Sequence, residues 1–233
     1  MTTEPSQPIR LSGRDRQVLE HVARYRMTTI TTLQQSLFPK LSANAAGKIA
    51  NRLCRPGLLA KYPLIHPSPY FVLGPQGANI LGLGSHRSTP LGPQALPIEY
   101  ALLLYCVRGQ QPRHRLLSRE LAELCPWLPS PLAAVPHCLD PHGNVLELVR
   151  VDLGGPADHV ARKAVQEISA RRRIPEFLAL ITEGRFRLVV ITATKNKSSA
   201  LRTALQQHDW PAGMQVHFSV VPQLLRFIVR TSH

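Results

Sequence analysis

The chain has 233 residues, of which 44% are hydrophobic, so it is long enough for one large domain or two modest domains with buried cores. Lys and Arg number 28 against 14 Asp and Glu, a formal net charge of +14 that favours a polyanionic partner, above all nucleic acid. The longest apolar run, Tyr100 to Val107, is too short to span a bilayer, and the first residues lack the apolar stretch of a signal peptide. We therefore expect a cytoplasmic, nucleoid-associated protein without a membrane partner.

Four dispersed cysteines show no paired spacing and suggest neither a zinc site nor a disulfide framework. We expect these thiols to be reduced and mostly buried. No phosphate-binding glycine loop or hydrolase motif is present in the sequence. The sequence therefore predicts no metal, no cofactor and no catalytic residue.

The first part of the chain predicts an arm and two helices. Residues 1–10 are polar and are expected to form a flexible arm. A helix is predicted to begin after the N-cap residue Ser12 and to end near Arg26, because apolar residues recur at helical spacing. Met27-Thr28 then favours a short extended piece, and a second helix is predicted to end near Phe38.

The stretch from Ser42 to Tyr70 predicts a third helix and a two-stranded hairpin. Ser42 is the candidate N-cap, Pro56-Gly57 stops the helix, and the turn of the hairpin is formed by His66 to Pro69. Apolar residues spaced for one buried stripe are Ala46, Ile49, Ala50 and Leu53. Helix, stop and hairpin follow one another in the order that a winged helix-turn-helix requires.

The opposite side of the third helix carries amide and cationic side chains and no acidic residue. Asn44, Lys48 and Asn51 are expected to reach base edges, because amide and ammonium groups suit them. Arg52, Arg55 and Lys61 are expected to contact phosphates, and His66 to lie at the wing tip near the minor groove. The predicted DNA-binding residues are Ser42, Asn44, Lys48, Asn51, Arg52, Arg55, Lys61 and His66. A basic face that is merely solvated is the alternative interpretation.

A resemblance to the winged-helix domains of the replication-relaxation family of plasmids and integrative elements is carried by three runs, RDRQVLEHVARYRMTTITTLQQSLFP, ANRLCRPGLLAKYPLI and PYFVLGPQGANILGL. In that pattern a helix ending in an aromatic residue precedes a short polar helix, a basic helix with LxxxGLL, and a wing that returns as an aromatic strand. The resemblance covers about residues 11–83. It implies a winged helix-turn-helix DNA-binding domain there, and a second domain that resembles restriction endonucleases.

Residues 84–97 are rich in Gly, Ser, Thr and Pro and are predicted to be a linker to a second domain at 98–233. The helix predicted over 98–108 is almost continuously apolar, so it is expected in the core of that domain or at a dimer contact. Residues 117–124 predict a short helix, and the proline-rich segment 126–136 is expected to be irregular.

Beyond residue 136 strands alternate with helices. Strands are predicted over 136–139, 144–153, 186–193 and 214–221, and helices over 156–171, 175–184, 198–208 and 222–229. This alternation indicates an α/β layered domain for dimerisation or partner binding. The whole chain is thus expected to be α+β, with an N-terminal winged helix-turn-helix and a restriction-endonuclease-like C-terminal domain.

The nuclease site that this resemblance implies is degenerate. It requires an Asp near the first core strand, and an acidic residue with a nearby Lys on the next. The chain has Pro136-His137 where Pro-Asp is expected, and Arg150-Val151-Asp152 where Glu-x-Asp is expected. Glu147 does not replace the missing carboxylate, because alternation places it on the opposite side from Asp152. We expect an inactive scaffold in which Asp152 caps the strand end or pairs with a basic neighbour.

Two further groups of residues are not expected to have a catalytic or metal-binding role. His137 is expected to be a partly exposed strand residue and not a ligand. Arg171-Arg172-Arg173 is expected to be a solvated helix end, with contact to DNA phosphates or to an acidic partner as the alternative.

The sequence thus predicts a sequence-specific DNA-binding transcriptional regulator, a repressor encoded by a mobile genetic element. It is expected to act as a homodimer on an inverted-repeat operator in double-stranded DNA. One alternative is a nuclease or relaxase accessory factor in plasmid replication or transfer. The other is an architectural or partition-type protein that binds DNA with low specificity.

Overall fold

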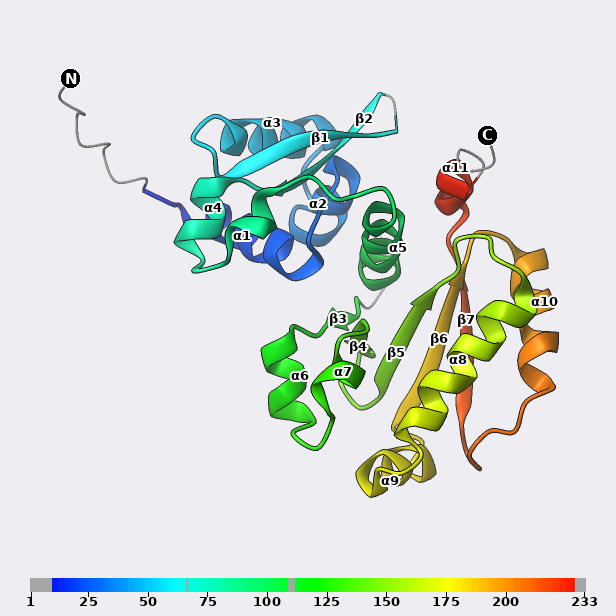
Figure 1. Cartoon of the computed structure of the whole chain (residues 1–233). Coiled ribbons are helices and arrows are strands. Elements are labelled where there is room, and N and C mark those ends of the chain that lie inside the picture. The colour runs from blue at the N-terminus through cyan, green and yellow to red at the C-terminus, as the bar shows by residue number, and fades with distance from the viewer. Residues whose placement is uncertain (1–9, 66, 109–111, 229–233) are drawn as a thin grey trace. The chain divides into compact units, whose positions relative to one another are not determined.

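The computed structural model describes residues 10–65, 67–108 and 112–228. The chain forms two compact units, Met1–Leu91 and Gly92–His233. Helices and strands occur in both, so the protein is of the mixed α+β class (Figure 1). No helix in the described ranges has the length and apolar character needed to cross a bilayer.

Unit 1 contains three helices, an antiparallel hairpin and two short helices, in that order along the chain. The elements are α1 (Gly13–Tyr25), α2 (Ile30–Leu37), α3 (Ala43–Cys54), β1 (Leu59–Ile65), β2 (Ser68–Leu73), α4 (Pro75–Ile80) and the 3-10 helix η1 (Ser85–Ser88). The helices and the hairpin predicted from the sequence are confirmed.

Side-chain caps define where the first three helices begin. The Ser12 hydroxyl accepts a hydrogen bond from the Asp15 backbone N–H, and the Asp15 carboxylate accepts one from the Ser12 N–H, which completes a capping box on α1. Thr29 caps α2, and Ser42 caps α3 by accepting from the Ala45 N–H. Short polar residues therefore fix these boundaries locally, as the sequence predicts for Ser12 and Ser42.

The core of unit 1 lies between the helices and the hairpin. Its buried residues include Val18, Leu19, Leu33, Ala46, Ala50, Leu53, Phe71 and Leu73. The predicted apolar stripe of α3 is therefore inward, with Ile49 half-buried at its edge. Gly47 is also buried, and a Cβ there would lie 3.3 Å from Cδ1 of Ile30, so α2 and α3 approach closely at this glycine.

Two contacts between distant residues attach the hairpin to the rest of unit 1. Thr28 and Phe71 exchange backbone hydrogen bonds of 2.9 and 2.8 Å, so the α1–α2 connection forms a bridge with β2. At the start of α4, a Cβ on Gly74 would lie 2.1 Å from the Gly57 carbonyl oxygen, and one on Gly77 would lie 2.1 Å from that of Leu58. These two positions therefore require glycine.

Unit 2 is a five-stranded sheet with helices on both faces. Its elements are α5 (Ala95–Val107), β3 (His114–Arg115), α6 (Ser118–Leu124), α7 (Ser130–Ala133), β4 (His137–Leu139), β5 (Leu146–Val151), α8 (Ala157–Arg171), α9 (Pro175–Thr182), β6 (Phe186–Thr192), α10 (Lys195–Gln206), β7 (Gln215–Val220), the 3-10 helix η2 (Pro222–Leu224) and α11 (Leu225–Ile228). Among the described residues the strand order is β3-β4-β5-β6-β7. Pairing is antiparallel from β3 to β5 and parallel from β5 to β7.

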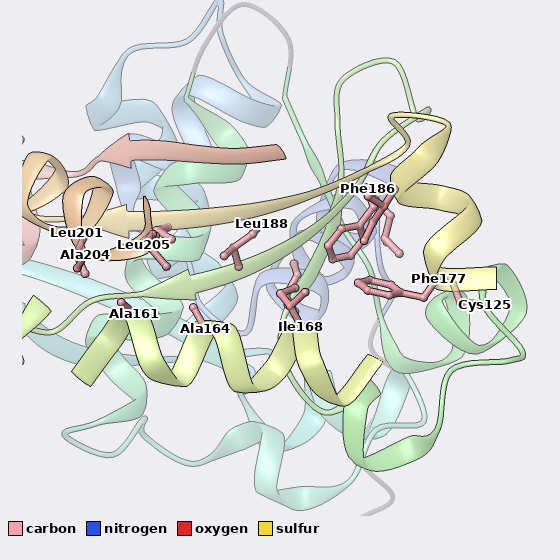
Figure 2. Close-up of a cluster of buried hydrophobic side chains, with 14 of the residues drawn as sticks. Cys125, Ala161, Ala164, Ile168, Phe177, Phe186, Leu188, Leu201, Ala204 and Leu205 are labelled. Atoms are coloured by element: carbon pink, nitrogen blue, oxygen red, sulfur yellow. The ribbon is translucent and has the colours of Figure 1, made fainter. Parts of the chain in front are cut away.

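Strand alternation separates an apolar face of the sheet from a more polar one. The apolar face packs against α8, α9 and α10 (Figure 1), and Figure 2 shows Ala161, Ala164 and Ile168 of α8 in this cluster. The Phe177 and Phe186 rings meet edge to face with centroids 4.7 Å apart. The opposite face is contacted by α5, at β5.

The structure differs from the sequence prediction in three short segments. The 3-10 helix η1 lies within the segment predicted as a linker, where the Ser88 hydroxyl donates to the Ser85 carbonyl at 2.7 Å, and α5 begins at Ala95, before the predicted Ile98. The segment expected to be irregular contains the four-residue helix α7. Strand β3 was not predicted, because two residues are too few to show alternation.

Candidate nucleic-acid interface

The exposed side of α3 gathers most of the predicted DNA-binding side chains. At about 100° per residue, positions 44, 48, 51, 52 and 55 share one side of the helix, opposite the buried Ala46, Ala50 and Leu53. All five side chains belong to exposed residues, and none of them is acidic. This arc is therefore a continuous polar and cationic surface.

Lys61 connects the hairpin to this surface. Its Nζ lies 3.5 Å from Oδ1 of Asn51, and both residues are exposed. β1 pairs with β2 so that Lys61 is opposite Phe71, whose ring is buried in the unit 1 core. The core thus holds Lys61 on the side of the hairpin that faces α3.

Arg52 is held differently from the other cations of α3. Its guanidinium forms an ion pair with Asp15 at the start of α1, and the Asp15 side chain is only 6% exposed while that of Arg52 is 55% exposed. Burial raises the pKa of Asp15, but the hydrogen bonds from Arg52 and Ser12 outweigh it, so the net pKa is lowered. Arg52 therefore joins α3 to α1 and still reaches solvent.

Asp15 is a positioning residue that the sequence prediction missed. Its place three residues after Ser12 signals a capping box, and the structure shows that the same carboxylate also binds Arg52, 37 residues further along the chain. The capping signal is local and readable, whereas the pairing with Arg52 depends on how α1 and α3 pack.

Lys48 and Arg55 differ from Arg52 in their partners. Within the described residues neither forms an ion pair with an acidic side chain. The two acidic residues in the described part of unit 1, Asp15 and Glu20, pair with Arg52 and Arg16. Acidic side chains in the described part of this unit therefore do not compensate the positive charge of Lys48 and Arg55.

Two of the predicted site residues remain apart from the exposed arc. Ser42 is exposed and its hydroxyl is engaged as the N-cap of α3, so its contribution is to position the first turn. His66 lies outside the described residues. The hairpin has a cavity of about 350 Å³, lined by Lys61, Tyr62, Pro63, Pro67, Ser68 and Pro69.

The predicted remnant of a nuclease site in unit 2 has a structural explanation. Asp152 follows β5, is 2% exposed, and accepts a hydrogen bond from the Gly154 N–H at 3.1 Å. Its Oδ2 lies 4.0 Å from Nζ of Lys197, which also donates to the Gly155 carbonyl. Burial raises the pKa of Asp152 in spite of this lysine. The interpretation of Asp152 as a strand-end cap beside a basic neighbour is confirmed.

No cluster of three or more His, Cys, Asp or Glu side chains suited to a metal ion occurs among the residues that the structure describes. Arg150, which the sequence placed beside Asp152, points to the α8 face and pairs there with Glu167. All four cysteines are free thiols, and Cys106, Cys125 and Cys138 are buried, as expected.

Two expectations about polar residues of unit 2 are wrong. His137 was expected to be partly exposed, but it is 2% exposed, its Nδ1 lies 2.8 Å from the Val135 carbonyl, and burial lowers its pKa to about 4. Arg171 was expected to be solvated, but it is 1% exposed and donates to the carbonyls of Glu167 and Leu132. Both lie where α7 and α8 cover the sheet, so packing removes them from solvent.

The geometry of α3 and the hairpin is therefore the strongest functional feature that the described residues present. Comparisons of the chain with models of protein families, with characterised proteins and with solved structures find no match.

Proposed function

We propose that unit 1 is a winged helix-turn-helix that binds double-stranded DNA, with α3 as the recognition helix and the β1–β2 hairpin as the wing. The observation that carries this proposal is the exposed arc of α3, which has cations and amides, no acidic residue, and Lys61 beside it. The 12 residues of α3 span about 18 Å, a length that the major groove admits.

The side chains of the arc divide by chemistry. Asn44, Lys48 and Asn51 suit base edges, because amides and ammonium groups match the donors and acceptors of the major groove. Arg55 and Lys61 suit the phosphate backbone. Arg52 holds α3 in place through Asp15, and its side chain, which is 55% exposed, can also approach a nearby phosphate.

We further propose that the protein is a sequence-specific transcriptional regulator, a repressor encoded by a mobile genetic element. The resemblance of residues 11–83 to the replication-relaxation family supports this assignment. A homodimer would present two recognition helices about 34 Å apart to an inverted repeat. Unit 2 would supply the dimer contact or bind a partner.

An inactive restriction-endonuclease-like fold is our proposal for unit 2. The order of α5, three antiparallel strands, α8 and β6 supports this fold. The single carboxylate at Asp152, with one oxygen bound to Gly154, supports loss of activity.

Selection of bound sequences from a random duplex library, using the full chain, tests the proposed regulator. Enrichment of one inverted-repeat sequence is expected, bound at least about a thousandfold more tightly than random duplex at physiological salt. Equal affinity for selected and random duplexes would overturn sequence-specific regulation and support the architectural or partition-type alternative.

The proximity of Lys197 to Asp152 makes a metal-dependent nuclease the second candidate. This alternative predicts magnesium-dependent nicking of supercoiled plasmid that disappears in Asp152→Ala. A preparation that leaves plasmid intact, with the same outcome for Asp152→Ala, would remove the nuclease candidate and leave the DNA-binding proposal standing.

A further inference from the structure

A fully buried carboxylate organises a group of polar side chains on the α5 face of the unit 2 sheet. Glu147 of β5 is 0% exposed and accepts a hydrogen bond of 2.8 Å from the Tyr105 hydroxyl of α5. Nε of Arg113 lies 3.2 Å from Oε2 of Glu147, and Nε of Arg187 lies 3.7 Å from Oε1. Two arginines therefore converge on one carboxylate from different segments.

The sheet register extends this group toward β7. Glu147 pairs with Arg187 on β6, and Arg187 pairs with Gln215 on β7, so these residues share a face. His217, two residues after Gln215, lies on the same face. Gln215 and His217 are exposed, so this part of the face is open to solvent in the described structure.

The charges of this group do not balance. Arg113 and Arg187 both face Glu147. Arg202 of α10 lies on the other face of the sheet, where its guanidinium is 4.6 Å from the centroid of the Phe218 ring. Burial lowers the pKa of His217, and Arg187, Arg113 and Arg202 lower it further, while Glu147 opposes them. Two guanidinium groups thus approach one carboxylate, and the local field is positive.

Arg187 has a hydrogen-bond donor, its Nε, without a partner among the described residues. Its Nε is buried and has no hydrogen-bond partner among the described residues, because the distance to Glu147 is too long for a hydrogen bond. Its side chain is 22% exposed. Glu147 therefore attracts the Arg187 guanidinium but does not accept a hydrogen bond from its Nε.

We propose that Arg113, Arg187 and His217 form a binding site for a phosphate group on this face of unit 2. Guanidinium groups bind phosphate oxygens through parallel N–H donors. Glu147, which is buried beneath them, orients the guanidinium groups of Arg113 and Arg187. A neutral imidazole adds one more N–H donor. A metal ion is disfavoured there, because the arginines repel a cation.

A network that only neutralises Glu147 is the competing explanation. One arginine and the Tyr105 hydroxyl already give that carboxylate a charge partner and a hydrogen bond. The second guanidinium group exceeds what neutralisation requires. An anionic ligand accounts for this excess.

Calorimetric titration of the full chain with inorganic phosphate tests this site. Arg187→Gln is expected to weaken phosphate binding roughly tenfold, the value of one or two charged hydrogen bonds, and His217→Ala is expected to weaken it as well. Arg185→Gln is the matched control, because Arg185 is exposed, lies two residues before Arg187 and pairs with Glu183. His217→Ala keeps the test valid if Arg187→Gln does not fold, because His217 is exposed.

A parallel titration with a random-sequence duplex distinguishes the two sources of phosphate. A loss of affinity for both phosphate and duplex in the two variants assigns the site to a nucleic-acid backbone. A loss for phosphate alone assigns it to a small phosphorylated ligand. The proposal is overturned if the wild-type chain does not bind millimolar phosphate, or if all three variants bind it as the wild type does.

Discussion

The two units place their acidic residues differently around their cations. Residues 1–91 contain 11 Lys and Arg against 3 Asp and Glu, whereas residues 92–233 contain 17 against 11. The arginines on strands of unit 2, Arg115, Arg150 and Arg187, each lie within ion-pair distance of a Glu. Lys48 and Arg55 on α3 have no such neighbour in the described structure. The position of cations without an acidic neighbour thus indicates a binding surface better than the net charge of the chain does.

Acidification is expected to cause the largest loss of stability. It tests whether both units are destabilised at low pH by a buried neutral histidine. Each unit buries a histidine, His21 or His137, and burial lowers the pKa of each from 6.5 to about 4. The unfolded chain therefore binds more protons between these pH values, so stability is full above about pH 6.5 and falls as pH drops toward 4. The expected loss is on the order of 3 kcal/mol per histidine.

Denaturant titrations at pH 7 and pH 4.5 measure this loss. Both tryptophans, Trp127 and Trp210, belong to unit 2, so their fluorescence follows that unit, while circular dichroism follows both. His21→Gln is expected to reduce the acid sensitivity of unit 1 only. Equal stability of unit 2 at the two pH values would contradict the burial of a neutral His137.

Gly77→Ala is expected to destabilise unit 1 by about 2–3 kcal/mol, because the new Cβ would lie 2.1 Å from the Leu58 carbonyl oxygen. Helicity and DNA binding should decrease together while tryptophan fluorescence stays native. Gly13→Ala is the control, because a Cβ there meets nothing within 4 Å. If DNA binding survived the unfolding of unit 1, the interface would have to lie in unit 2.

Lys48→Ala is expected to weaken binding to the selected operator roughly tenfold. Lys163→Ala removes another exposed lysine, from α8, and should leave operator affinity unchanged. Fluorescence anisotropy with labelled operator measures both variants. Equal losses in the two would show that overall charge, and not the α3 face, drives binding.

Arg52→Ala is expected to have the smallest effect on stability, below about 1 kcal/mol, because more than half of its side chain is exposed and the pair with Asp15 is screened. If Arg52 also contacts a phosphate, the slope of log affinity against log salt should decrease by about one. Arg16→Ala, which breaks a surface pair with Glu20, is the control. An unchanged slope would restrict Arg52 to holding α3 on α1.

Local signals account for the parts of the fold that the sequence predicted. Ser12, Thr29 and Ser42 cap helices because each can bond a nearby backbone N–H, and such bonds require no distant partner. An apolar run likewise marks β6, which is buried along almost its whole length. The exposed arc of α3 follows from the helical periodicity of its apolar residues.

Burial of polar residues could not be predicted from the sequence, because it depends on which helices and strands pack over each residue. His137 and Arg171 are polar by composition, and only the packing of α7, α8 and the sheet removes them from water. The pair of Asp15 with Arg52 and the group around Glu147 also join residues far apart in sequence. Spacing within one segment carries no information about such contacts.

The two backbone hydrogen bonds between Thr28 and Phe71 make local opening of unit 1 measurable by amide hydrogen exchange. Each of these amide protons exchanges with solvent only when the α1–α2 connection and β2 separate. Their exchange rates in deuterated water would therefore report how often the hairpin detaches from the helices, residue by residue and without any substitution. A ligand seated on both α3 and the hairpin would slow the two amides together.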